Sequence, residues 1–248
     1  MREGDFRIRG REISRVEGLS DAVFGFAIAL LAISLEVPKT SAEVLHALRG
    51  VGAFAITFLL LFNLWRAQYT FFRRYGIEDA KVVMLTGMLL FVLLIFVYPL
   101  KFIMATMTDK LLGVVGFPDP NFHRSSVLPD RDIPLLFGAF GLGFAGVFAV
   151  FNAMYRHAYS LRDTLHLDAV ERFDTLERLR VTAVLIGLGL GIGISYLASA
   201  AIPSAATAFD YCATAIMIVS ALAVVRLRKT RNTRRAVLVP GASQPEHA

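Results

Sequence analysis

The sequence predicts an all-α integral membrane protein with six transmembrane helices and both termini in the cytoplasm. Three observations lead to this fold class: an apolar composition, six apolar segments of spanning length, and an uneven distribution of basic residues. Of the 248 residues, 56% are hydrophobic and only 19% are charged. Soluble domains are typically about 45–50% apolar and about 25% charged. A soluble core of this size cannot bury so much apolar surface, which argues against a soluble enzyme.

Six apolar segments have the length of about 20 residues that a helix needs to cross a bilayer core. The expected helices lie at about 18–37, 45–65, 82–105, 135–155, 181–201 and 205–225. Barrel strands are shorter and alternate between apolar and polar residues, so they do not fit these near-continuous runs. We therefore expect residues 1–229 to form one transmembrane domain and the polar tail at 230–248 to be disordered in the cytoplasm.

The segments between the expected helices have their own patterns. The proline-rich stretch at 111–134 is expected to be an irregular external loop, and 161–180 is expected to form an amphipathic cytoplasmic helix. Glycines recur at short spacing in the fourth and fifth segments: Gly138, Gly141, Gly143, Gly146, Gly187, Gly189, Gly191 and Gly193. Small residues at such spacing are typical of helices that pack closely in lipid.

The basic residues indicate the orientation, because cytoplasmic loops carry the excess of Lys and Arg. Twenty of the 26 lie before the first segment, between the second and third, between the fourth and fifth, or after the sixth. Those positions share one side of the membrane, which we assign to the cytoplasm. The same distribution explains the net charge of +6 without a nucleic-acid partner. We expect a multi-pass protein of the cell membrane.

The residues of common catalytic and metal sites are sparse and scattered. Cys212 is the one cysteine, which excludes an internal disulfide and a multi-cysteine zinc site. The five histidines are spaced too widely for a local ligand pair, and a GxSxG nucleophile motif is absent. We therefore expect no enzymatic activity, no bound metal and no cofactor.

The start of the first segment carries an ionisable residue, Asp21, about one turn inside the membrane. Such residues point to function by default, although an interfacial anchor is the alternative. At 100° per residue, Asp21 points about 140° away from Phe26, beside Gly25 and Ala32. We expect this carboxylate to meet another helix. One apolar stripe contains Leu19, Ala22, Phe26, Leu30, Ile33 and Val37.

The residues around Asp21 resemble a known motif. Arg15, Leu19, Ser20 and Asp21 match the RxxxFSD signature of prokaryotic members of the transmembrane protein 175 family of potassium channels, except that Leu19 replaces Phe. The six-helix count, the chain length, Val37-Pro38 and Pro99 also resemble the family. One departure lies in the second segment, where Arg66 follows Trp65 in place of the family's His.

The resemblance implies a homotetramer whose central pore is lined by four copies of the first helix and conducts potassium or other monovalent cations. By position in the motif, Phe26, Leu30 and Ile33 would form a hydrophobic constriction, and Ala22, Ala29 and Val37 are further pore-facing candidates. Arg15, Ser20 and Asp21 would form a hydrogen-bonded assembly network. Phe26 replaces a usual Ile and Ala29 a frequent Thr, so we expect weaker selectivity for potassium over sodium.

Two other functions are open: a non-conducting membrane scaffold, or a small carrier built on the same helices. A carrier needs polar residues near the bilayer midplane, where these segments are almost wholly apolar.

Overall fold

The computed structural model describes residues 2–3, 6–10, 12–33, 41–114, 133–202, 212, 215–217 and 219–227. A two-stranded antiparallel hairpin, β1 (Arg2–Glu3) and β2 (Phe6–Arg7), precedes the helices. The long helices are α1 (Arg15–Ile33), α2 (Ser41–Tyr75), α3 (Ala80–Val114), α5 (Ile133–Ser160) and α6 (Ala169–Ala201). Residues 215–217 and 219–227 are also helical.

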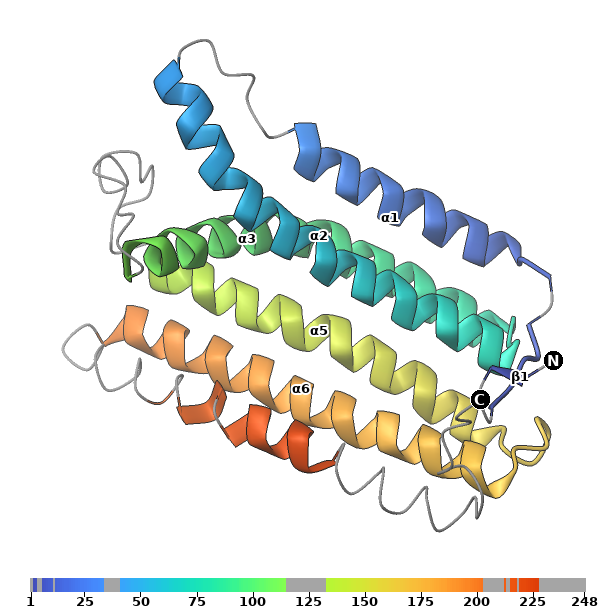
Figure 1. The fold of residues 1–248 in the computed structure, drawn as a ribbon. Coiled ribbons are helices and arrows are strands. Elements are labelled where there is room, and N and C mark those ends of the chain that lie inside the picture. The colour runs from blue at the N-terminus through green and yellow to red at the C-terminus, as the bar shows by residue number, and fades with distance from the viewer. Residues whose placement is uncertain are drawn as a thin grey trace, which may run out of the picture.

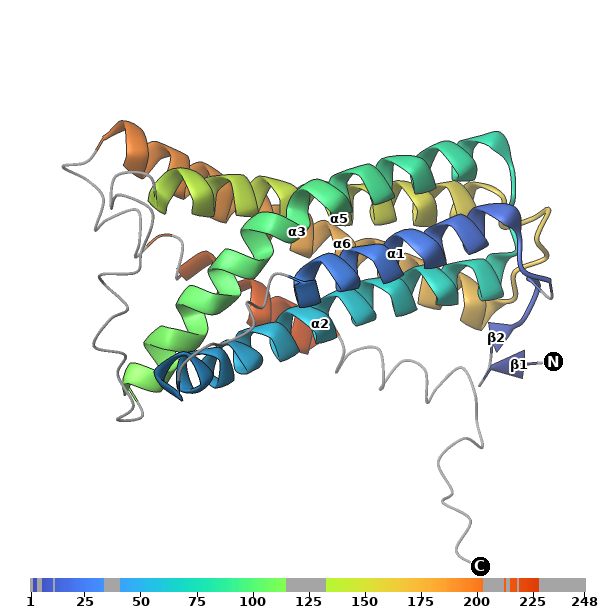
Figure 2. The same cartoon turned by 90° about the horizontal axis from the view of Figure 1, so that it is seen from above.

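The helices run antiparallel in a layered bundle (Figure 1). Helix α1 lies at one edge and packs on α2 and α3, while α5 lies between α3 and α6. Apolar side chains with almost no exposed surface fill the space between α2, α3 and α5; among them are Leu61, Leu89, Leu93, Phe151 and Met154. Helix α3 bends part-way along its length (Figure 2), and Pro99 inside it accounts for the bend.

Four of the long helices are long and apolar enough to cross a membrane. They are α2 over Val51–Tyr75, α3 over Ala80–Val97, α5 and α6. The structure corrects the predicted lengths, because α2 and α3 are each 35 residues long. At 1.5 Å per residue each measures about 52 Å, well beyond a hydrocarbon core of about 30 Å.

The helix predicted at 161–180, leading into the fifth segment, begins later than expected. Residues 161–166 form turns, and α6 then runs without a break from Ala169 to Ala201. Asp168 caps this helix by accepting a hydrogen bond from the backbone N–H of Glu171, whose side chain bonds back to the Asp168 backbone. This capping box fixes the start of the helix, and the sequence to Ala201 contains no proline to end it.

Several expectations fall outside the described residues. They concern Val37, residues 115–132 of the predicted external loop, much of the predicted sixth helix at 205–225, and the tail at 230–248. Helix α3 continues to Val114, so the part of that loop at 111–114 is helical.

The predicted close packing of the glycine-rich helices is confirmed. A Cβ atom on Gly141 of α5 would lie 2.4 Å from the backbone N of Gly193 and 2.7 Å from the carbonyl O of Gly189, both on α6. A Cβ on Gly189 would likewise lie 2.7 Å from the backbone N of Ala145. The two backbones can approach this closely because side chains are missing at the crossing.

Candidate pore helix and its contacts

Helix α1 has two faces of different chemistry. Glu17, Ser20, Phe24, Ala27 and Leu31 are buried and recur at helical spacing. This buried face packs on α2 and α3. The opposite face is apolar and exposed: it carries Leu19, Ala22, Phe26 and Ala29. Helices α2 and α3, on which α1 packs, do not cover this exposed apolar face.

The expected constriction residues differ in exposure. Phe26 lies on the exposed face with 57% of its surface accessible. Leu30 is half-buried, because it lies at the border between the two faces. Ile33 is the last residue of α1. The side chain of Ile33 and all of Val37 lie outside the described residues. Ala22 and Ala29 are exposed beside Phe26.

Two residues of the motif bind α2 through side chains. Gln68 donates a hydrogen bond from Nε2 to Ser20 Oγ at 2.9 Å, and the Ser20 hydroxyl donates to the Val16 carbonyl at 2.8 Å. The Trp65 indole N–H donates to Asp21 Oδ1 at 2.7 Å. Asp21 is exposed and lies at the edge of the contact between the two helices. Ser20 and Asp21 therefore fix α1 against α2 within one chain.

Arg15, the third residue of the expected network, does not take part in these contacts with α2. Its side chain is exposed and makes no hydrogen bond or ion pair with other residues that the structure describes. The charged contact of α1 is made instead by Glu17, which is only 5% exposed. Arg73 Nη2 lies 2.6 Å from both carboxylate oxygens of Glu17. Removing one partner of such a buried pair costs about 3–5 kcal/mol, because the other charge stays buried.

Glu17 and Arg73 were not among the residues predicted from the sequence. A signal was present, because Glu17 precedes Ser20, Phe24 and Ala27 at the spacing of a single helix face. A carboxylate on the buried face of a helix needs a cation from the element that covers it. The separation of 56 positions in the chain hid Arg73 from that reasoning.

The N-terminal segment ties α1 to two further helices. Arg9 Nη2 lies 2.6 Å from Glu171 Oε2 of α6, and the Arg7 backbone N–H donates to the other oxygen of Glu171 at 2.8 Å. The Arg9 backbone N–H donates to the Arg73 carbonyl at the end of α2. Phe6 is buried and packs edge-to-face on Tyr75. No pattern in the sequence predicted this segment, which we call the N-terminal strap (residues 6–10).

No three His, Cys, Asp or Glu side chains come close enough to hold a metal ion within the described ranges. The arrangement positions one helix, rather than reactive groups around a substrate. Polar contacts fasten one face of α1 to its own chain at the end where the strap lies, and the opposite apolar face is left uncovered.

Comparison with known proteins identifies the family. The sequence profile described as "Endosomal/lysosomal potassium channel TMEM175" matches residues 15–99, from the start of α1 to the proline of α3. A protein of Marivirga tractuosa named potassium channel is 37% identical over 171 residues, which make up 69% of each chain. The chain belongs to the TMEM175 family. The resemblance found in the first predicted helix is thereby confirmed.

A solved structure agrees with this assignment. A crystal structure of a variant of the potassium channel MtTMEM175, in complex with a nanobody–MBP fusion, matches with a TM-score of 0.74 at 32% identity. The match covers 90% of this chain and 97% of that one. The TMEM175 family is one of ion channels rather than of enzymes. With its apolar helices, this TMEM175 member is a multi-pass membrane protein.

Proposed function

We propose that this TMEM175 member is a homotetrameric potassium channel of the cell membrane, with a central pore lined by α1 of four copies. Ions move passively, so no cofactor is needed beyond the permeant cation. The observation that carries the proposal is the two-faced character of α1. Its buried face is fastened to α2 and α3, while Phe26 and the alanines beside it face away from the bundle.

The position of α1 supports assembly around that helix. It lies at one edge of the bundle, whereas α6 and the helical residues 219–227 lie on the opposite side (Figure 1). Four copies arranged about a common axis can bring their α1 helices together while the remaining helices contact lipid. In this arrangement the complete channel domain is residues 1–229, with six transmembrane helices and both termini in the cytoplasm.

The constriction follows from the spacing of large apolar side chains. Phe26 and Ile33 are seven residues apart, about 10 Å of helix rise, with Leu30 between them. Rings of such side chains gate by dewetting, because an ion entering the dry segment loses its hydration. Phe26 is the bulkiest of the three and more exposed than Leu30, and Ala29 offers no hydroxyl to replace lost water. We therefore expect weak conduction and modest selectivity for potassium over sodium.

Flux into liposomes tests the proposal. The purified chain is reconstituted, and potassium and sodium flux are measured for wild type, Phe26→Ala and Leu30→Ala. With Phe26 as the narrow point, we expect Phe26→Ala to raise flux several-fold and Leu30→Ala to change it little. The reverse pattern would place the narrow point at Leu30. Ile194→Ala is the matched control: it removes an exposed aliphatic side chain on α6, which lies on the side of the bundle opposite α1 (Figure 1).

The outcomes separate the three functions. Absence of cation flux in wild type and variants would indicate the scaffold, and flux that saturates with ion concentration would indicate the carrier. If neither pore variant alters a measurable flux, α1 does not line the pore. Equal effects of Ile194→Ala and Phe26→Ala would mean that the change is nonspecific.

A further inference from the structure

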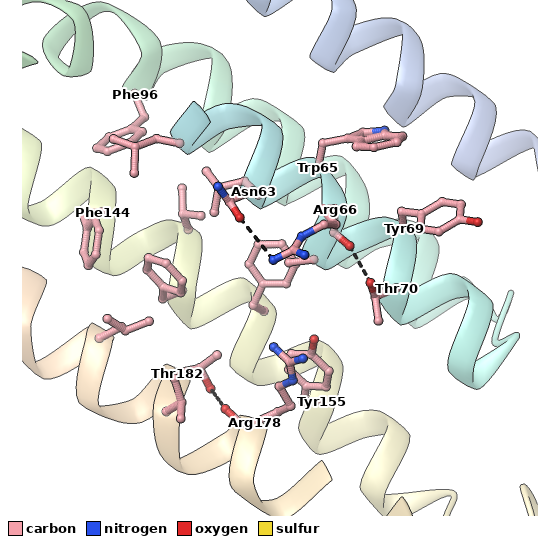
Figure 3. A pocket seen from close by; sticks show the side chains of 18 of the residues that line it. Asn63, Trp65, Arg66, Tyr69, Thr70, Phe96, Phe144, Tyr155, Arg178 and Thr182 are labelled. Carbon is pink, nitrogen blue, oxygen red and sulfur yellow. Dashed lines mark hydrogen bonds between the residues drawn. The ribbon is translucent and has the colours of Figure 1, made fainter. Parts of the chain in front are cut away.

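A cavity of about 620 Å³ lies between α2, α3, α5 and α6, and none of its lining residues belongs to α1 (Figure 3). It extends along α2 from Leu60 to Arg74, fourteen residues or about 21 Å of helix rise. Arg74 lies one residue before the end of α2, at the end of the bundle where the strap lies. The cavity therefore reaches from the apolar middle of the helices to their basic end.

The part of the cavity that extends along α2 from Arg66 to Arg74, about 12 Å of helix rise, is strongly basic. Arg66 and Arg74 of α2 and Arg178 of α6 line it, and its lining contains no Asp or Glu. Figure 3 shows Arg66 and Arg178 on either side of the space. An exposed cavity end with three cations and no carboxylate is complementary to an anion.

The three arginines have donors to spare. Arg66 donates only a long hydrogen bond of 3.3 Å to Asn63 Oδ1, and the Arg178 guanidinium has no hydrogen-bond or ion-pair partner among the described residues. The Nε atom of Arg74 is buried without a hydrogen-bond partner in the same part of the chain. The planar guanidinium fork matches the geometry of a phosphate group. The Arg74 guanidinium lies over the Phe6 ring, 4.8 Å from its centroid, so Arg74 adds positive charge beside the space. A phosphate between Arg66 and Arg178 would satisfy the free donors of those two side chains.

The other end of the cavity is apolar and aromatic. Phe96 of α3 and Phe140 of α5 stack with ring centroids 5.1 Å apart, and Phe144 and Phe148 lie 4.7 Å apart along α5. Leu60, Leu64 and Leu185 complete this part of the lining. Such a surface suits a hydrocarbon chain and offers nothing to a free inorganic anion.

We propose that this cavity, the arginine groove, binds one anionic phospholipid of the cytoplasmic leaflet. Its phosphate lies between Arg66 and Arg178, with Arg74 adding positive charge farther along α2, and one acyl chain lies along the phenylalanine rings. Basic pockets between transmembrane helices on the cytoplasmic side bind acidic headgroups in this way. The choice of leaflet rests on the proposed orientation of the channel, whereas binding itself does not.

Native mass spectrometry of the detergent-purified full chain tests the proposal independently of ion flux. Phosphatidylglycerol and phosphatidylcholine with identical acyl chains are titrated against wild type and the double variant Arg66→Gln/Arg178→Gln. We expect one phosphatidylglycerol per chain in wild type and a loss of affinity of about tenfold or more in the double variant. Phosphatidylcholine should bind wild type no better than it binds the double variant.

Two further pairs make the result interpretable. Arg156→Gln/Arg180→Gln removes two exposed arginines that lie outside the groove, and we expect affinity within about twofold of wild type. Arg66→Lys/Arg178→Lys keeps both positive charges but loses the planar guanidinium groups, so we expect an affinity between those of wild type and Arg66→Gln/Arg178→Gln. This variant also provides a test if Arg66→Gln/Arg178→Gln folds poorly.

Three results would overturn the proposal. Equal binding of the two lipids would show a nonspecific acyl site, and equal losses in the control and groove pairs would show general charge attraction. Full displacement of the lipid by millimolar inorganic phosphate would show a free-anion site. If ion flux is absent but lipid binding follows the expected pattern, the channel proposal fails while the arginine groove stands.

Discussion

At the scale of single residues, the two carboxylates of α1 illustrate how a helix face sets the role of a charge. Glu17 and Asp21 are one turn apart, yet Glu17 is buried against Arg73 and Asp21 is exposed beside Trp65. Glu17 holds α1 to its own chain. Asp21 has acceptor capacity beyond its single bond to Trp65, because an ionised carboxylate accepts several hydrogen bonds. We propose that this capacity serves contacts between copies.

Asp21→Ala should therefore weaken the oligomer more than Trp65→Phe does. Both substitutions remove the hydrogen bond between α1 and α2, but only the first removes the carboxylate. Oligomer mass by light scattering and thermal stability in detergent provide the measurements. If the two variants behave alike, Asp21 acts only within its chain. Unchanged mass and stability in Asp21→Ala would exclude an assembly role.

The residue scale also shows what the sequence could predict. Helical spacing placed Phe26, Ala22 and Leu19 on one stripe, and the structure describes all three on the exposed face. Spacing along one helix carries no information about a partner from another helix. The Glu17–Arg73 and Arg9–Glu171 pairs join residues 56 and 162 positions apart, so they became visible only in three dimensions.

At the scale of helices, the contact between α5 and α6 depends on missing side chains. Gly141→Ala would place a Cβ atom 2.4 Å from a backbone nitrogen of α6, and backbone cannot move aside as a side chain can. We expect the helices to separate and the protein to lose about 1–3 kcal/mol, seen as a thermal midpoint lower by several degrees in detergent.

Gly187→Ala is the matched control, because a Cβ at Gly187 on α6 would meet nothing within 4 Å. Its thermal midpoint should stay close to that of wild type. A decrease as large as that of Gly141→Ala would mean that helix packing does not explain the effect.

The start of α3 adds a dependence on pH. Asp79 accepts a hydrogen bond from the Val82 backbone N–H and pairs with His157 of α5. Burial raises the pKa of Asp79, but these two contacts outweigh it and leave the pKa below its usual value. The stabilisation is thus present above about pH 3.9, the pKa of an unfolded Asp, and is lost as pH falls through the lower folded pKa.

We expect the thermal midpoint of wild type to fall more steeply below about pH 4 than that of Asp79→Asn. Asparagine still caps a helix, so this variant isolates the charge. Thermal unfolding in detergent between about pH 3 and pH 6 provides the measurement. Parallel profiles for the two proteins would show that Asp79 gains no stabilisation from its charge.

Helix positions were easier to predict than helix ends. Apolar runs located α1, α2, α3, α5 and α6 correctly, because burial in lipid requires them. The ends of α2 and α3 lie well beyond those runs, since polar and aromatic residues near the helix ends continue the backbone hydrogen bonding outside the apolar core. The start of α6 was signalled by Asp168 and Glu171, whose capping spacing the sequence analysis did not use.

At the scale of the whole molecule, charged and polar contacts gather at one end. The N-terminal strap, the end of α2 and the start of α6 meet there through Arg9, Arg73 and Glu171 (Figure 1). Because α1 follows the strap directly, these contacts connect the proposed pore helix to α6. If α1 moved along its axis, it would either break the contacts of the strap with α2 and α6 or move those helix ends with it.

The same end should face the cytoplasm, because twenty of the 26 basic residues flank it or the termini. Single cysteines are introduced in a Cys212→Ser background at Glu78, Ser160 and Thr230, and at Lys39 for the opposite side. Glu78 and Ser160 are exposed, so lack of labelling would not reflect burial. With a membrane-impermeant maleimide on intact cells, we expect Lys39→Cys to react at once and the other three only after permeabilisation. Labelling of Glu78→Cys or Thr230→Cys from outside would reverse the orientation and move the arginine groove to the external leaflet.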